Sequence, residues 1–202
     1  MENNKIRISC AGSSNTDGWP GTLDYTPFTY FLQFLLGESY EVMNFGKYNT
    51  TATFSMDDPY IINEKYRDLM VSKPDIVTLK LGGNDSKNYN WKLHGKYFKR
   101  DYSILVDRIL SLGTKPAVLL CTPTRILPDN PYKMLLGGVL EKEIVPQIIE
   151  VARERDLKVL DFHNLLADSS FFDEDNIHLN NKGHEAAAGI IFDEVKNLNK
   201  EG

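Results

Sequence analysis

The sequence predicts an α/β fold: one doubly wound α/β/α domain of three layers over residues 1–202, built on a five-stranded parallel sheet. Short β-type runs alternate with longer segments of helical period. That alternation implies crossover connections and helices on both faces of a parallel sheet. The chain length suits one domain with a substantial core. The sequence contains no internal repeat, low-complexity tract or interdomain linker, so nothing divides the chain.

Strands are expected where apolar runs are short, and helices where apolar residues recur at a spacing of three or four. In the third helical segment, Tyr102, Leu105, Val106 and Ile109 fall on one face, and the following SLGTKP ends the helix with a Gly and a Pro. In chain order, the expected elements are the strand Lys5–Ala11, the helix Pro27–Leu36, the strand Tyr40–Phe45, the helix Asn63–Val71, the strand Ile76–Leu81, the helix Asp101–Leu112, the strand Ala117–Cys121, the helix Gly138–Arg155, the strand Lys158–Phe162 and the helix Lys182–Asn197.

Composition excludes several classes of protein. The apolar fraction of 42% and the charged fraction of 25% are those of an ordinary soluble globular protein. The net charge of −5 and the absence of a basic stripe argue against a nucleic-acid partner, and the apolar runs are too short to span a membrane. The N-terminus lacks the apolar segment of a secretory signal, so we expect a cytoplasmic protein, with a trimmed leader as the alternative. Cys10 and Cys121 lie in apolar runs and are expected to be buried thiols.

The loops after the strands are the places to look for a site, because sites in open parallel sheets form beyond the carboxyl ends of the strands. GSSNTDG follows the first strand, NFGKYNTTA the second and LGGNDSKNYNW the third, while FFDEDNIHLNNKGHEAAA follows the fifth across a longer loop. Each loop alone is ordinary, because Ser, Gly, Asn and Asp are common in turns and at helix caps.

Together, these loops supply the groups that a serine hydrolase needs: a hydroxyl, a base, a group that orients the base, and donors for the oxyanion. Ser14 supplies the hydroxyl, His178 the base, and Asp175 lies three residues before that base. The Ser14 N–H, the Gly46 N–H and the Asn84 side-chain amide are the candidate oxyanion donors. The sequence lacks the G-x-S-x-G elbow of the α/β-hydrolases.

The four loops resemble the blocks of the SGNH (GDSL-type) hydrolases, a family of flavodoxin-like α/β/α esterases. GSSNTDG is similar to the family's G-D-S-x-T-x-G, NFG to its second-block glycine, GGND to its third-block asparagine, and DNIHLNNKGH to D-x-x-H-x-N-x-x-G. The resemblance spans residues 12–184. It implies a nucleophile, two further oxyanion donors and the rest of a catalytic triad at Ser14, Gly46, Asn84, Asp175 and His178, with no cofactor and no metal.

One position departs from the family pattern: Ser13 stands where the family has an Asp that braces the turn. A serine makes fewer hydrogen bonds and carries no charge, so a looser turn is expected. Ser13 is also a rival nucleophile, although the register of Thr16 and Gly18 favours Ser14.

A narrower resemblance is to bacterial sialate or other carbohydrate O-acetylesterases, on the stretches YEVMNFG, DDPY and KPDIVTLKLGGNDSKNYNW. Aromatic residues fall in the loops around the expected site. Their rings either stack on a sugar or pack against the domain, and both interpretations stay open. These residues are Trp19, Tyr48 and Trp91, the candidate substrate contacts, with Tyr25 and Tyr89 beside them.

The predicted function is a serine esterase that hydrolyses short acyl esters, with acetyl as the best candidate, of a carbohydrate or another small alcohol. Three alternatives stay open. The first is a broad-specificity carboxylesterase, lysophospholipase or thioesterase-like acyl hydrolase. The second is a non-catalytic flavodoxin-like binding protein, although the first loop lacks the glycine motifs that cradle phosphate. The third is a metal-dependent hydrolase, which no H-x-x-x-H or H-E-x-x-H spacing supports and whose ligands would come from Asp161, His163, Asp175, His178 and His184.

Overall fold

The centre of the protein is a parallel sheet with five strands. The computed structural model describes residues 5–18 and 26–198. The strand order is β2-β1-β3-β4-β5, and every neighbouring pair is parallel. The predicted α/β fold is confirmed, and each strand begins and ends within two residues of its expected bounds. The strands are β1 (Ile6–Gly12), β2 (Tyr40–Gly46), β3 (Ile76–Lys80), β4 (Ala117–Cys121) and β5 (Lys158–Leu160).

Helices connect the strands and cover the sheet. The predicted helix Gly138–Arg155 is three consecutive pieces, because the helix widens into a π-helical turn in its middle. The helical elements are α1 (Ser14–Asp17), α2 (Phe28–Leu36), η1 (Tyr60–Ile62), α3 (Glu64–Val71), η2 (Asn84–Ser86), α4 (Asn88–His94), η3 (Gly95–Tyr97), α5 (Phe98–Leu110), α6 (Gly137–Val139), η4 (Leu140–Ile144), α7 (Val145–Glu154), α8 (Phe162–Leu165), η5 (Ser169–Phe171) and α9 (Asn181–Leu198).

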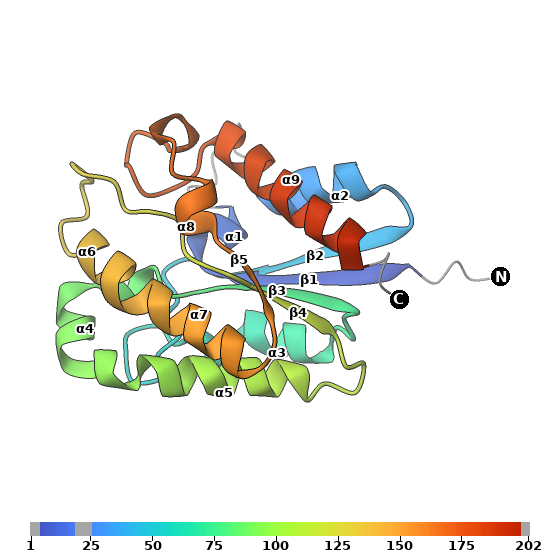
Figure 1. Ribbon diagram of the computed structural model, residues 1–202, viewed down its shortest axis with the longest axis horizontal. Helices are drawn as coiled ribbons and strands as arrows, with labels where there is room; N and C mark the ends of the chain where they lie inside the picture. The colour runs from blue at the N-terminus through green and yellow to red at the C-terminus, as the bar shows by residue number, and fades with distance from the viewer. Residues whose placement is uncertain (1–4, 19–25, 199–202) are drawn as a thin grey trace.

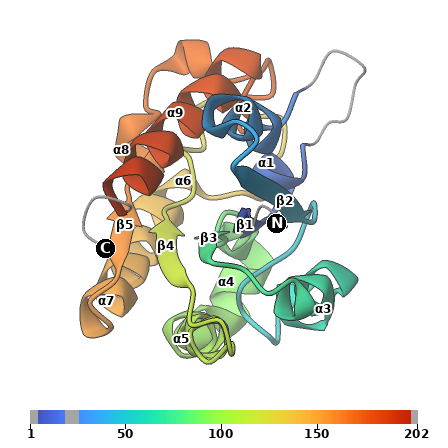
Figure 2. The same cartoon turned by 90° about the vertical axis from the view of Figure 1, so that its right-hand side faces the viewer.

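The helices form two layers, one on each face of the sheet. Figure 2 shows α2 and α9 over one face, and α3, α5 and α7 over the other. The side chains of β3 alternate between these layers: Ile76 packs in the core under α2 and α9, whereas Val77 and Leu79 pack in the core under the other three helices. The three-layer arrangement is therefore built by the period-two alternation of buried strands.

The strand order places a crevice at the carboxyl ends of β1 and β3. The chain leaves β1 for β2 on one side and returns to β3 on the other (Figure 1), so the loops after β1 and β3 diverge from neighbouring strand ends. The short helix α1 lies directly against the end of β2, where a Cβ on Gly46 would be 2.1 Å from the Asp17 nitrogen. The first two strands therefore present their following loops close together.

Candidate active site

The turn that carries Ser14 is closed by backbone hydrogen bonds. The Ser13 carbonyl accepts from the N–H groups of Thr16 and Asp17, both at 2.9 Å, while the Ser13 side chain makes no capping hydrogen bond. Gly18 ends the helix in a left-handed conformation at φ 102°, which favours glycine. Ser14 thus occupies the first position of α1, where backbone N–H groups have no acceptor within the helix.

Ser14, His178 and Asp175 lie in a chain of hydrogen bonds. The Ser14 Oγ is 2.9 Å from the His178 Nε2, and the His178 Nδ1 contacts Asp175 Oδ2. Asp175 Oδ1 accepts the backbone N–H groups of Ile177 and His178, both at 2.9 Å. Because the carboxylate accepts a hydrogen bond from the Nδ1–H, the proton of a neutral His178 stays on Nδ1 and its Nε2 is free to accept the Ser14 hydroxyl proton.

Hydrogen bonds keep Asp175 ionised. Partial burial alone would raise the pKa of its carboxyl, but the His178 ring and the N–H groups of His178 and Ile177 outweigh burial and lower the pKa to about 2. The carboxylate is therefore charged at neutral pH, and in this position it can stabilise an imidazolium at His178.

Asn15 joins the loop of His178 to the turn of Ser14. Its Oδ1 accepts the N–H of Leu179 at 2.8 Å and its Nδ2 lies 3.5 Å from the Ile177 carbonyl, so one side chain bonds on both sides of His178. Asn15 is buried. Sequence reasoning missed this residue, because an Asn beside a predicted turn is ordinary turn composition.

The structure does not bring all three expected oxyanion donors to the site. The Asn84 side chain faces the cavity above Ser14 and also donates to the Thr50 carbonyl at 3.1 Å. The Gly46 N–H instead donates to the Asn44 side chain at 2.8 Å, and Gly46 does not line the cavity. This corrects the expectation for Gly46: β2 extends through that residue, and its N–H is already bonded.

A different backbone group lies at the cavity, three residues further on. Asn49 lines the cavity with a left-handed backbone at φ 66°. Within residues 5–18 and 26–198, its N–H has no acceptor. No signal in the sequence marks this position, since Asn tolerates the left-handed region without requiring it.

The chain matches a known family over nearly all of these elements. The model of the GDSL-like lipase/acylhydrolase family matches residues 10–186, which includes Ser14, Asn84, Asp175 and His178. The chain belongs to this family. The resemblance seen in the four loops is therefore confirmed, and the prediction of a carboxylic ester hydrolase is confirmed at the level of the family.

One relative of this chain is named for a carbohydrate ester. An acetylxylan esterase of Xylanibacter ruminicola is 35% identical over 211 residues, covering 95% of this chain but only 43% of its own length. Two solved structures share the fold. Est24, a carbohydrate acetylesterase from Sinorhizobium meliloti, superposes with a TM-score of 0.78 at 21% identity, covering 96% of this chain and all of its own. The aryl esterase of M. smegmatis superposes with a TM-score of 0.76 at 23% identity over 95% of this chain and 99% of its own.

The cavity above Ser14 has a volume of about 430 Å³. One part of its lining is apolar, from Pro123, Ile126, Leu135 and Ile177. Another part is polar and charged, and it comes from the loop after β2 and the start of α4. The cavity can therefore hold an acyl group and at least part of an alcohol larger than the acyl group.

The aromatic candidates divide into three cases. Tyr48 lines the cavity with 47% of its surface exposed, and Tyr89, also at the cavity, is 49% exposed. Trp91 does not line the cavity, because its ring packs against the core beside Phe98 and its indole N–H donates to Glu143. Trp19, like Tyr25, lies outside the described residues. Sequence reasoning missed Tyr132, which lines the cavity 42% exposed.

The histidines and carboxylates weighed as metal ligands do not gather in one cluster within the described residues. Across the described ranges, no three His, Cys, Asp or Glu side chains gather closely enough to hold an ion. His184 is fully buried and accepts the Phe28 N–H at 3.1 Å, and burial together with the nearby basic groups lowers its pKa to about 3. None of the described helices is both long and apolar enough to cross a membrane.

Proposed function

We propose that this chain is a serine esterase that removes acetyl groups from a carbohydrate, with Ser14, His178 and Asp175 as its catalytic triad. The observation that carries the proposal is the 2.9 Å contact between Ser14 Oγ and His178 Nε2, with Asp175 on the other ring nitrogen and a cavity directly above. The names of the acetylxylan esterase relative and of the Est24 structure support acetyl and carbohydrate as the two halves of the ester.

Acylation begins when His178 Nε2 takes the Ser14 proton and Ser14 Oγ attacks the ester carbonyl carbon. The developing oxyanion accepts hydrogen bonds from the Ser14 N–H, the Asn84 side-chain amide and the Asn49 N–H, which replaces Gly46 in the proposed oxyanion hole. One such donor contributes about 3 kcal/mol to the stability of the transition state. As the carbonyl reforms, the ester C–O bond breaks and the leaving alcohol takes the proton from His178.

Deacylation repeats these steps with water. His178 Nε2 takes a proton from a water molecule, the hydroxide attacks the acetyl carbonyl, and the same donors hold the second oxyanion. Ser14 then leaves as the alcohol with the proton from His178, and acetic acid is released, which ionises to acetate in solution. Asp175 remains a carboxylate throughout, in keeping with its lowered pKa.

The carbohydrate half of the substrate is supported by the rim of the cavity. Tyr48, Tyr89 and Tyr132 are each about half exposed, and tyrosine rings combine an apolar face for stacking with a hydroxyl for hydrogen bonding. An acetylated xylo-oligosaccharide is therefore the first sugar ester to test.

The test is hydrolysis of p-nitrophenyl acetate and of acetylated xylo-oligosaccharides by the wild type, Ser14→Ala and His178→Ala. Both variants should lose at least 1000-fold in kcat, since a triad acts as a unit. Ser13→Ala is the matched control and should keep most of the activity. A Ser14→Ala variant that still turns over ester at the wild-type rate would disprove the proposed nucleophile.

A broad-specificity carboxylesterase is the second candidate, favoured by the apolar lining of Ile126, Leu135 and Ile177. A series of p-nitrophenyl esters separates the two. A sugar deacetylase should prefer the acetyl ester over the octanoyl ester and should hydrolyse acetylated xylo-oligosaccharides. A broad carboxylesterase should hydrolyse the longer-chain esters and should not hydrolyse acetylated xylo-oligosaccharides.

A further inference from the structure

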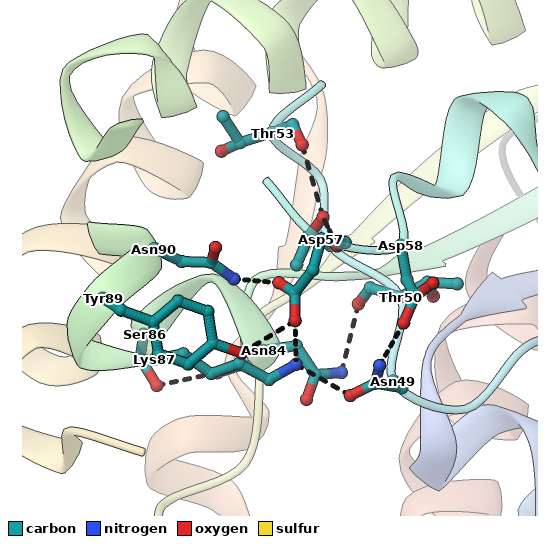
Figure 3. Close-up of polar contacts among 12 residues, drawn as sticks. Asn49, Thr50, Thr53, Asp57, Asp58, Asn84, Ser86, Lys87, Tyr89 and Asn90 are labelled. Carbon is teal, nitrogen blue, oxygen red and sulfur yellow. Dashed lines mark hydrogen bonds and ion pairs between the residues drawn. The ribbon is translucent and has the colours of Figure 1, made fainter. Parts of the chain in front are cut away.

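A nearly buried ammonium group stands in the wall of the cavity. Lys87, at the junction of η2 and α4, is 5% exposed and lines the cavity. Its Nζ donates to Asp57 Oδ2 at 2.9 Å and to Asn49 Oδ1 at 2.7 Å (Figure 3). A charge is rarely buried unless it is paired, so this geometry points to a defined role for the pair at the cavity wall.

The partner carboxylate collects donors from one short segment. Besides Lys87, Asp57 accepts the Tyr89 hydroxyl at 2.8 Å and contacts the Asn90 side-chain amide (Figure 3). Burial alone would raise the pKa of Asp57, but the hydrogen bonds from Asn90, Lys87 and Tyr89 outweigh burial and lower that pKa. Three side chains from the start of α4 therefore bind one ionised carboxylate from the loop after β2, and they tie that loop to the loop after β3.

The Asn49 side chain is the point where this network reaches the reacting centre. Lys87 donates to its Oδ1, and its Nδ2 contacts Asp58, so both ends of the amide are bonded. The left-handed backbone of Asn49, at φ 66°, costs free energy for any residue other than glycine. The side-chain bonds oppose that cost and fix the direction of the Asn49 N–H. The next carbonyl, that of Thr50, accepts the Asn84 amide, so both donors depend on the same loop.

We propose that Lys87 and Asp57 are a positioning pair: they hold Asn49 in its left-handed conformation and so aim its N–H at the oxyanion. The inference rests on the proposed function, because it assigns the pair to that same oxyanion hole. Neither side chain needs to touch the ester. Their effect is therefore on the stabilisation of the oxyanion, which changes kcat, rather than on the binding of the sugar, which changes KM.

The first test is Lys87→Met, measured on p-nitrophenyl acetate and on acetylated xylo-oligosaccharides. We expect kcat to fall by about 10- to 100-fold on both esters, below the full loss of one oxyanion donor, with KM within about twofold. Lys99→Met is the matched control: Lys99, in α5, forms ion pairs with Glu150 and Glu154 of α7, and its loss should leave both constants unchanged.

A double-mutant cycle separates positioning from a general loss of structure. Asn49→Gly adopts the left-handed backbone readily but has no side chain for Lys87 to hold. If Lys87 acts through that side chain, adding Lys87→Met to Asn49→Gly should lower kcat by less than threefold. If Lys87→Met does not fold, Asp57→Asn takes its place in the same cycle.

Two results would overturn the proposal. A cycle in which the two losses in kcat simply multiply would show that Lys87 acts on something other than Asn49. A rise in KM for the sugar ester alone, with kcat intact, would make Lys87 a substrate contact. Neither result touches the proposed catalytic triad, which fails if Ser14→Ala retains activity.

Discussion

Two buried tyrosines differ in a single hydrogen bond, and this difference predicts opposite effects of the same substitution. Tyr60, in η1, and Tyr102, in α5, are both 0% exposed, and both rings pack in the core on the same face of the sheet. The Tyr60 hydroxyl donates to the Phe45 carbonyl at 2.7 Å. The Tyr102 hydroxyl is buried and has no hydrogen-bond partner among residues 5–18 and 26–198. Replacing each tyrosine by phenylalanine therefore isolates the hydroxyl.

The magnitudes follow from the two environments. An unsatisfied buried hydroxyl costs about 1 to 3 kcal/mol, so Tyr102→Phe should raise the free energy of unfolding by about 1 kcal/mol. Tyr60→Phe removes the hydrogen bond to the Phe45 carbonyl, so it should lower the free energy of unfolding by about 1 kcal/mol. For a chain of 202 residues, 1 kcal/mol corresponds to a shift in Tm of about 2 to 4 °C.

Urea denaturation of the wild type and both variants measures these differences, with the m value as a check that the unfolded states are comparable. The urea midpoint should be highest for Tyr102→Phe, intermediate for the wild type and lowest for Tyr60→Phe. Equal destabilisation by the two substitutions would refute the reasoning, because it would show that the Tyr102 hydroxyl is satisfied as well as that of Tyr60.

Three further predictions concern other sites. The pKa of Asp175 is lowered from 3.8 to about 2, so its ionisation should add roughly 2 kcal/mol to the free energy of unfolding above pH 4. This contribution should be lost as the pH falls through 2. Urea unfolding of Asp175→Asn, which has no carboxylate to titrate at this position, should lack that loss. Gly46→Ala should have a clearly lower Tm than the wild type, since its Cβ would lie 2.1 Å from a backbone nitrogen of α1. The Cβ of Gly138→Ala would meet no atom within 4 Å, so the Tm of that variant should match or exceed that of the wild type in a thermal melt. Cys10 and Cys121 are buried, and burial raises the pKa of both thiols, so neither should react with a thiol reagent until the protein is unfolded; fast labelling of the native protein would contradict their placement.

The sheet could be predicted from the sequence because its signal is local. Strands such as Ile76–Lys80 are short apolar runs, and the helices between them show the 3.6-residue period. The short helix Ser14–Asp17 was not predicted, because four residues of turn-forming composition carry no period. Nor was the π-helical turn at Leu140–Ile144, since an extra residue in one turn leaves the apolar pattern almost unchanged.

In the candidate site, too, local sequence patterns predicted some residues and missed those that depend on distant contacts. Ser14, Asp175 and His178 could be predicted because the family's loops carry them at characteristic places, and the structure brings the three together. The expectation for Gly46 was wrong because it depended on the acceptor of one N–H, and the structure gives that N–H to a side chain two residues earlier. The position of Asn49 depends on contacts with residues 9 and 38 positions away, which no local pattern reveals.

The bond between Ser14 and His178 joins residues 164 positions apart, so under the proposed mechanism the loops that carry them must meet before an ester can be cleaved. Closing a loop of that length is among the slowest and least local steps that folding offers. Turnover of a chromogenic acetate during refolding is therefore a measure of when the whole sheet has assembled. The circular dichroism signal, which follows helices as they form locally, should recover before the turnover of the acetate does.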